Sequence, residues 1–156
     1  MSFMQVSRKV DYALRAAIHL ASDEHRERAC SVAEIAERER VPRQFLEKII
    51  RDLIRTGLVR SRRGPHGGYV LARPAEDVTF KDVIEAVEGP ISLNVCVGEH
   101  AECFLLGTCG MNRVWAEGQR RVMDLFQNTT IASVRHAIPG GGSGPIRPEY
   151  SSPAGV

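Results

Sequence analysis

Hydrophobic residues recur at three- and four-residue intervals in the first part of the chain, a spacing that is typical of amphipathic helices. The first such stretch begins at Ser7, whose hydroxyl can cap a helix, and runs to about Ala21. A shorter stretch begins at Ser31, which fits a capping box with Glu34, and should end near Arg40. The pattern therefore predicts a long helix, a polar loop and a short helix.

A third helix is expected between Pro42, which suits the first turn of a helix, and Gly57, which suits the left-handed position after the last turn. Its apolar face carries Phe45, Leu46, Ile49, Ile50 and Leu53. Its polar face carries Arg43, Gln44, Glu47, Lys48, Arg51 and Arg55. We expect the first face to be buried and the second, mostly basic, face to lie in solvent.

The pattern then changes to that of short strands. The segments LVRSRR (residues 58–63) and YVLAR (residues 69–73) predict two strands. Between them, GPHGG (residues 64–68) places three glycines around a proline and a histidine, which suits a tight, exposed turn. The three segments together predict a β-hairpin.

Two further helices are predicted after the hairpin. Thr79 and Asp82 can cap a helix that runs to about Glu88. A long helix from Gly110 to about Gln127 carries a broad apolar stripe made of Met111, Val114, Trp115, Gly118, Val122, Leu125 and Phe126.

The remaining segments have weaker patterns. Residues 90–109 show no clean periodicity and are expected to form a loop. Thr129 or Thr130 can cap a last short helix to about Ala137. Residues 139–156 are mostly Gly, Pro and Ser, and we expect this tail to be disordered.

The charge is unevenly distributed, although the formal net charge is only +2. Residues 38–63 hold nine Lys/Arg against three acidic residues, whereas residues 76–102 hold seven acidic residues against one lysine. The first segment can meet a polyanion and the second would be repelled by one. Charge alone also fits a solvated helix face.

The order short helix, turn, basic helix and glycine-tipped hairpin predicts a winged helix-turn-helix that binds double-stranded DNA. Three residues at the start of the basic helix are placed to reach base edges: Arg43, Gln44 and Glu47. Three further along are placed near phosphates: Lys48, Arg51 and Arg55. Three at the hairpin tip suit a narrow minor groove: Arg62, Arg63 and His66. A protein-binding winged helix is the alternative.

The length of 156 residues suits about one domain, and no apolar run approaches the 18 residues of a membrane span. The amino-terminal stretch lacks the apolar core of a signal peptide, so we expect a cytoplasmic protein. In a reducing cytoplasm, clustered thiols favour metal or redox roles over structural disulfides. We find no phosphate loop, nucleotide motif or nucleophile–base pattern, so we expect no enzyme.

Three of the four cysteines, Cys96, Cys103 and Cys109, share the loop with the spacing C-x6-C-x5-C. Thiolates bind zinc, copper(I) and iron–sulfur clusters. Zinc knuckles have closer spacing, so a loop that surrounds a larger cluster fits better. Cys30 is expected to be a half-buried structural thiol, and His19 a packed or surface histidine rather than a ligand.

The segments DYALRAAIHLA, SVAEIAERERVPRQFLEKII, RGPHGGY and the three cysteines followed by GMNRVW resemble the Rrf2 family of bacterial regulators, from about Met4 to Val134. The iron–sulfur members of that family include the IscR, NsrR and RirA types. The resemblance implies a mainly α-helical fold with a small β-hairpin wing and a long carboxyl-terminal helix that pairs across a homodimer. It also implies a transcription factor that reads a palindromic operator, one half-site per subunit.

The resemblance also bears on the fourth cluster ligand. The IscR type has a histidine three residues after the last cysteine, where this chain has Asn112. The RirA type resembles this chain in that its last cysteine is followed by Gly-x-Asn. The NsrR type uses a carboxylate from the first helix of the other subunit, which corresponds to Asp11 here. A related type has glutamate there and a histidine four residues later, where this chain has Arg15.

We therefore expect the three cysteines to bind an iron–sulfur cluster with Asp11 of the other subunit. The absent histidine and the present aspartate slightly favour [4Fe–4S] over [2Fe–2S]. An open or labile iron site is the second interpretation, and a ligand from His100 or Glu99 the third. Asp11 also fits a plain first-turn acid that is stabilised by the helix dipole.

These expectations divide the chain into four parts. Residues 1–89 form the winged helix-turn-helix, 90–109 the cysteine loop, 110–138 the dimerisation helix with a short terminal helix, and 139–156 the tail. The cluster is expected to sense nitric oxide, redox state or iron supply and so to change operator affinity. The alternative is a regulator of the same fold that holds no cluster and senses oxidation through the thiols themselves.

Overall fold

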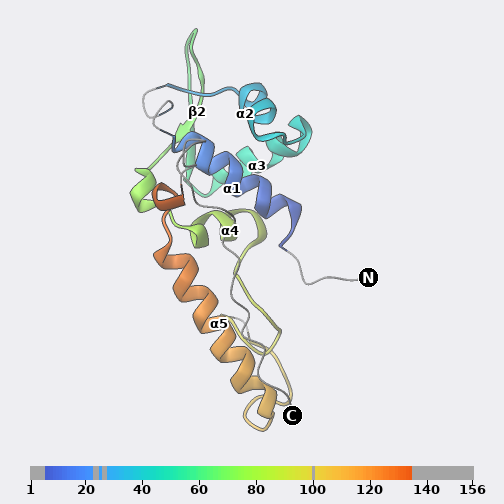
Figure 1. Cartoon of the computed structure of the whole chain (residues 1–156). Helices are drawn as coiled ribbons and strands as arrows, with labels where there is room; N and C mark the ends of the chain where they lie inside the picture. The colour runs from blue at the N-terminus through green and yellow to red at the C-terminus, as the bar shows by residue number, and fades with distance from the viewer. Residues whose placement is uncertain (1–5, 23–24, 26–27, 100, 135–156) are drawn as a thin grey trace, which may run out of the picture.

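The computed structural model describes residues 6–22, 25, 28–99 and 101–134. It is mainly helical, with one two-stranded antiparallel hairpin and a long carboxyl-terminal helix, so the predicted fold class is confirmed (Figure 1). The elements in chain order are α1 (Arg8–Leu20), α2 (Val32–Glu39), α3 (Arg43–Arg55), β1 (Val59–Arg62), β2 (Gly68–Leu71), η2 (Ala75–Asp77), α4 (Phe80–Glu88), α5 (Gly110–Asn128) and η3 (Ala132–Val134).

The helix starts follow the capping residues that the sequence predicts. The Ser7 hydroxyl accepts a hydrogen bond from the Val10 backbone N–H, and the Ser31 hydroxyl accepts one from the Glu34 backbone N–H. Thr79 and Asp82 form the full capping box at the start of α4. In α2 the Glu34 carboxylate pairs with Arg28, so the predicted box there is only half formed.

The hydrophobic core lies between α1, α2, α3, α4 and the hairpin. Its fully buried side chains include Ile35, Leu46, Ile49, Ile50, Leu53, Val59, Val83 and Ile131. Phe45 was expected in this core but is 56% exposed, and its ring contacts Tyr12 edge to face at 6.4 Å between centroids. The expectation was wrong because Leu46, Ile49 and Leu53 already define the buried stripe, and Phe45 lies one residue outside it.

The hairpin is joined to the helical unit by a short backbone bridge. Strands β1 and β2 pair in the register Val59↔Leu71 to Arg62↔Gly68. Cys30 and Tyr69 exchange two backbone hydrogen bonds, at 3.0 and 2.8 Å between N and O. Gly68 allows this close approach, because a Cβ there would lie 2.4 Å from the Cys30 carbonyl oxygen. The base of the hairpin is therefore fixed against the segment that precedes α2.

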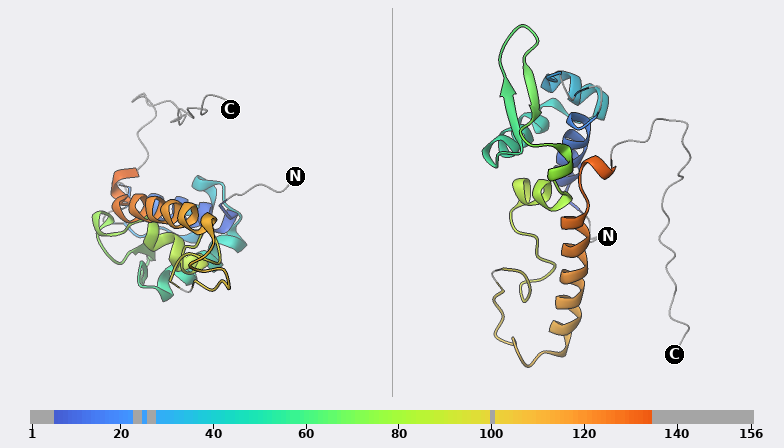
Figure 2. Two further views of the ribbon diagram at one scale, coloured as in Figure 1. Left: turned by 90° about the horizontal axis from the view of Figure 1, so that it is seen from below. Right: turned by 90° about the vertical axis from the view of Figure 1, so that its left-hand side faces the viewer.

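Helix α5 extends away from the winged helix unit (Figure 2). Its carboxyl end is held by backbone hydrogen bonds from Phe80 N–H to the Thr129 carbonyl and from Ile131 N–H to the Val78 carbonyl, at 2.9 and 2.8 Å. No residue of α5 is buried. The expected last helix is the short 3₁₀ turn η3, and residues 135–156, including the predicted tail, lie outside the described residues.

The residues that the structure describes contain no helix that is long and apolar enough to cross a membrane.

Candidate nucleic-acid interface and cysteine loop

Helix α3 presents a basic outer face. Its buried face is formed by Leu46, Ile49, Ile50 and Leu53, as the amphipathic pattern predicts. The six residues predicted to contact nucleic acid from this helix are all exposed: Arg43, Gln44, Glu47, Lys48, Arg51 and Arg55. The Arg43 guanidinium donates to the Glu47 carboxylate one turn later, at 3.1 Å between Nε and Oε1. The face thus offers both donors and an acceptor at the start of the helix.

Asp52 is the acid of α3 that does not share this outer face. Its carboxylate lies 2.9 Å from the Lys9 ammonium of α1 and 3.3 Å from the Arg55 guanidinium. The hydrogen bond from Lys9 lowers the pKa of Asp52, and Arg55 adds to the effect. Lys9 also donates to the Val87 carbonyl of α4. One lysine thus neutralises the acid and joins α1, α3 and α4.

The hairpin wing protrudes at the end of the molecule farthest from the amino end of α5 (Figures 1 and 2). The predicted wing residues Arg62, Arg63 and His66 are exposed. Gly64 has φ +124°, a conformation that side-chain-bearing residues rarely adopt, and it permits the tight turn. The wing therefore carries its basic side chains on a narrow projection suited to a groove.

The three loop cysteines line one cavity of about 100 Å³. Cys96, Cys103 and Cys109 are half-buried and are not in disulfides. The rest of the lining is largely apolar and includes Leu105, Leu106, Met111 and Trp115. The structure thus brings together the three thiols that the spacing suggested as ligands.

Two amide side chains of α5 hold the loop in place. Asn112 Nδ2 donates to the Cys96 carbonyl at 3.0 Å. Gln119 lies two turns further on, where its Nε2 donates to the Ile91 carbonyl at 2.7 Å and its Oε1 accepts from the Leu93 N–H at 2.9 Å. Asn112, in the position where the IscR type has histidine, is therefore an anchor for the backbone of the first cysteine.

Within one chain, Asp11 is not part of the cysteine cavity. It lies on α1, half-buried, and its carboxylate pairs with the Arg15 guanidinium at 2.9 Å. It lines a separate surface pocket together with Ile18 and Phe80. Glu99 is exposed, and His100 lies outside the described residues.

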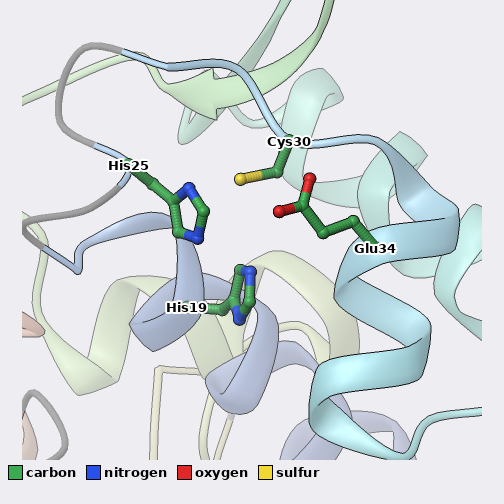
Figure 3. Close-up of side chains that lie close together, drawn as sticks. All are labelled: His19, His25, Cys30 and Glu34. Carbon is green, nitrogen blue, oxygen red and sulfur yellow. The ribbon is translucent and has the colours of Figure 1, made fainter.

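A second group of ligand-type side chains was not expected from the sequence. His19, His25, Cys30 and Glu34 each offer one atom, and these atoms lie within 4.8 Å of one another (Figure 3). Cys30 was expected to be half-buried but has no exposed surface, and His19 is packed, as expected, at 7% exposure. The four residues come from α1, α2 and the segment between them, so only the fold reveals their proximity.

Comparison with known proteins places the whole described chain in one family. The Rrf2 family, described as "Iron-dependent Transcriptional regulator", matches residues 6–137. An rrf2-like HTH-type transcriptional regulator of Rhodobacter capsulatus is 34% identical over 133 residues, which cover 81% of this chain and 89% of the relative.

Solved structures agree with this assignment. CymR of B. subtilis, titled the global cysteine regulator, has a TM-score of 0.70 at 29% identity, over 85% of this chain and 97% of CymR. IscR of T. potens has a TM-score of 0.69 at 30% identity, over 83% of this chain and 85% of IscR. The basic helix, the wing and the family match together show that the chain belongs to the Rrf2 family of DNA-binding winged helix transcriptional regulators and is not an enzyme.

Proposed function

We propose that the protein is a homodimeric regulator whose affinity for a palindromic operator depends on an iron–sulfur cluster bound by Cys96, Cys103 and Cys109. The observation that carries the proposal is that these three thiols, separated by six and five intervening residues along the loop, line a single cavity. Among the described residues, the ligand atoms that lie within 4.8 Å of one another belong to His19, His25, Cys30 and Glu34, outside this loop. The C-x6-C-x5-C spacing of the trio, wider than that of a zinc knuckle, favours a cluster over a single ion.

The surroundings of the cavity fit such a group. Leu105, Leu106 and Trp115 give it apolar walls, which limit access of water to the thiolates. Cys109 is the N-cap residue of α5, a helix of 19 residues. The positive end of the helix dipole favours the negative charge of a thiolate-bound cluster there. When bound, the cluster would supply chemistry that reacts with nitric oxide, with oxidants or with iron shortage.

We propose Asp11 of the other subunit as the fourth ligand, with [4Fe–4S] as the favoured cluster. The Asp11 carboxylate lies half-exposed at the surface of α1 and pairs with the Arg15 guanidinium at 2.9 Å. A carboxylate is a harder ligand than a thiolate, so it is the more easily displaced. The ligand would connect the cysteine loop of one subunit with the winged helix unit of the other.

The dimer itself is supported by the exposed stripe of α5. Met111, Val114 and Leu125 are 65%, 72% and 62% exposed, although the sequence pattern predicts them on the apolar face. An unpartnered apolar stripe along a long helix is typical of a protein interface. A second copy of α5 would cover it and place two recognition helices on two half-sites.

Helix α5 connects the cysteine loop with the winged helix unit, so a change in the loop can alter the position of that unit. Asn112 holds the loop near the amino end of α5, and the chain at the carboxyl end is bonded to Val78 and Phe80 at the start of α4. The Phe80 ring of α4 packs on the Phe126 ring of α5 at 6.0 Å between centroids. Ordering of the loop would therefore bias how α5, and with it each winged helix, is placed.

The second candidate function keeps the regulator but has no cluster. The same three cysteines are half-exposed, so oxidants can reach them and convert them to disulfides or sulfenic acids. This function predicts reversible oxidation without iron.

An anaerobic preparation separates the two functions. Absorption and Mössbauer spectra, with counts of iron and acid-labile sulfide, should show a cluster that is lost when Cys96, Cys103 or Cys109 is replaced by serine. Cys30→Ser, the same chemical change outside the loop, should retain it. Iron- and sulfide-free protein with intact DNA binding and oxidation-sensitive electrophoretic mobility would instead support the thiol sensor.

A further inference from the structure

The group formed by His19, His25, Cys30 and Glu34 lies at the base of the wing, where the Cys30 backbone pairs with Tyr69 of β2. His19, His25 and Cys30 are 7%, 2% and 0% exposed, and Glu34 is partly buried. Figure 3 shows the two imidazoles, the thiol and the carboxylate pointing toward one another. Their ligand atoms already lie within 4.8 Å of one another. Around a tetrahedral zinc ion such atoms are about 3.3–3.8 Å apart, so a small contraction completes a site.

The hydrogen bonding of His19 prepares one ligand atom. Its Nδ1 lies 2.9 Å from the Glu39 carboxylate, which can only accept, so Nδ1 carries the proton. Nε2 is buried and makes no hydrogen bond within the described structure. A carboxylate that binds the far nitrogen of an imidazole is the usual partner of a metal-binding histidine, because it fixes the tautomer and the ring orientation.

We propose that these four residues bind a divalent transition-metal ion, for which zinc is the best match. Imidazole, thiolate and carboxylate are all donor types that zinc binds, whereas calcium and magnesium require oxygen ligands. The His19 and His25 rings are stacked at 4.7 Å between centroids, so the ion would draw one nitrogen of each ring toward the Cys30 sulfur. Arg28 binds one oxygen of Glu34, and ion binding would compete with or share that contact.

The site would act on the wing rather than on the cysteine loop. Cys30 exchanges two backbone hydrogen bonds with Tyr69 of β2, His19 lies in the last turn of α1, and Glu34 lies in the first turn of α2. An ion that joins them would fix the base of the wing against the two helices that precede the recognition helix. A surface pocket lined by His25, Leu20 and Arg73 offers a route for its entry.

The test uses the full-length chain with Cys96, Cys103 and Cys109 replaced by serine, so that no thiolate remains in the loop. Titration with Co²⁺, displaced afterwards by Zn²⁺, should show one ion per chain, a thiolate-to-cobalt charge-transfer band and the strong ligand-field bands of four-coordinate cobalt. Because this readout leaves all four ligands intact, it does not depend on whether Cys30 tolerates substitution.

Variants in the same background test the ligand set. His19→Gln and Glu34→Gln should weaken cobalt affinity by at least about tenfold. Glu37→Gln, which changes an exposed acid on the same helix, should leave it unchanged. Cobalt binding without a thiolate band, or equal affinity of the Glu34→Gln and Glu37→Gln variants, would overturn the proposal. Neither result bears on the cluster proposed for the loop.

Discussion

Lys9 and Asp52 form an ion pair that links three helices through two side chains. The Lys9 ammonium contacts the Asp52 carboxylate of α3 at 2.9 Å and donates to the Val87 carbonyl of α4. The two side chains are 40% and 26% exposed, so solvent screens the pair only in part. The pair holds α3 against the rest of the core without using its exposed basic face.

Replacing this lysine should therefore cost stability in a pH-dependent way. Lys9→Met should lower the free energy of unfolding by about 0.5–1 kcal/mol at pH 7. The pKa of Asp52 is lowered in the folded state, so its contribution is present above the unfolded pKa and is lost as the pH falls through the folded pKa. Denaturant unfolding of both proteins at a series of pH values should show the difference shrinking below about pH 4. An equal difference at pH 7 and at pH 2 would contradict this account.

At the scale of elements, the sequence predicted the helix starts, because these depend on residues that are close together in the chain. Ser7, Ser31 and Thr79 cap helices because each side chain meets a backbone N–H within its own turn. Phe45 was misplaced because periodicity does not show where a buried stripe ends. The grouping of His19 with Cys30 could not be predicted, since it depends on how α1 packs against the segment before α2.

Two arginines of α3, the predicted recognition helix, are expected to contact DNA in different ways. We expect Arg43, exposed at the start of α3, to reach base edges. Arg43→Ala should therefore change sequence preference, at a cost of about 1–3 kcal/mol for the preferred operator. Arg51→Ala should weaken binding to all sequences alike and reduce the salt slope by about one. Fluorescence anisotropy with operator and random DNA at several salt concentrations measures both effects. Arg121→Ala, which removes the same charge from α5, is the control and should change neither.

A substitution at Gly68 tests the backbone bridge that fixes the wing to the helical unit. Its φ is +154°, and a Cβ there would lie 2.4 Å from the Cys30 carbonyl oxygen. Gly68→Ala should destabilise the protein by about 1–3 kcal/mol, because both the conformation and the close approach are lost. Gly110→Ala, where a Cβ meets nothing within 4 Å, is the matched control. Equal thermal unfolding of the two variants would show that the wing is not fixed at this point.

At the scale of the whole molecule, α3 and the wing lie toward one end, and the loop of residues 90–109 runs beside α5 toward the other end (Figure 1). The sequence predicted the length of α5 and its apolar stripe, but a single chain leaves that stripe exposed. The proposed dimer accounts for the exposure, and it also supplies Asp11 from a second copy. Periodicity shows that the stripe is apolar. It does not show which surface covers the stripe, because that surface belongs to another molecule.

The proposed dimer interface can be broken with one charge. Leu125→Glu, at a side chain that is 62% exposed in the single chain, should shift the protein toward monomer, because a carboxylate would be buried between two copies of α5. Gln127→Glu adds the same charge at an exposed position outside the stripe and should remain dimeric. Sedimentation velocity distinguishes them. A monomeric wild-type protein would contradict the proposed dimer, and dimeric behaviour of both variants would place the interface elsewhere.

The claim that the loop controls DNA binding is tested most directly by one titration. Operator DNA selected by the protein from a random pool is bound under anaerobic conditions, at fixed salt, by cluster-loaded protein and by the same preparation after removal of iron. The account predicts that the two affinities differ by about 5- to 150-fold, the usual range for coupled sites, and that the Cys103→Ser protein matches the iron-free form. Equal affinities of the loaded and iron-free protein would contradict it.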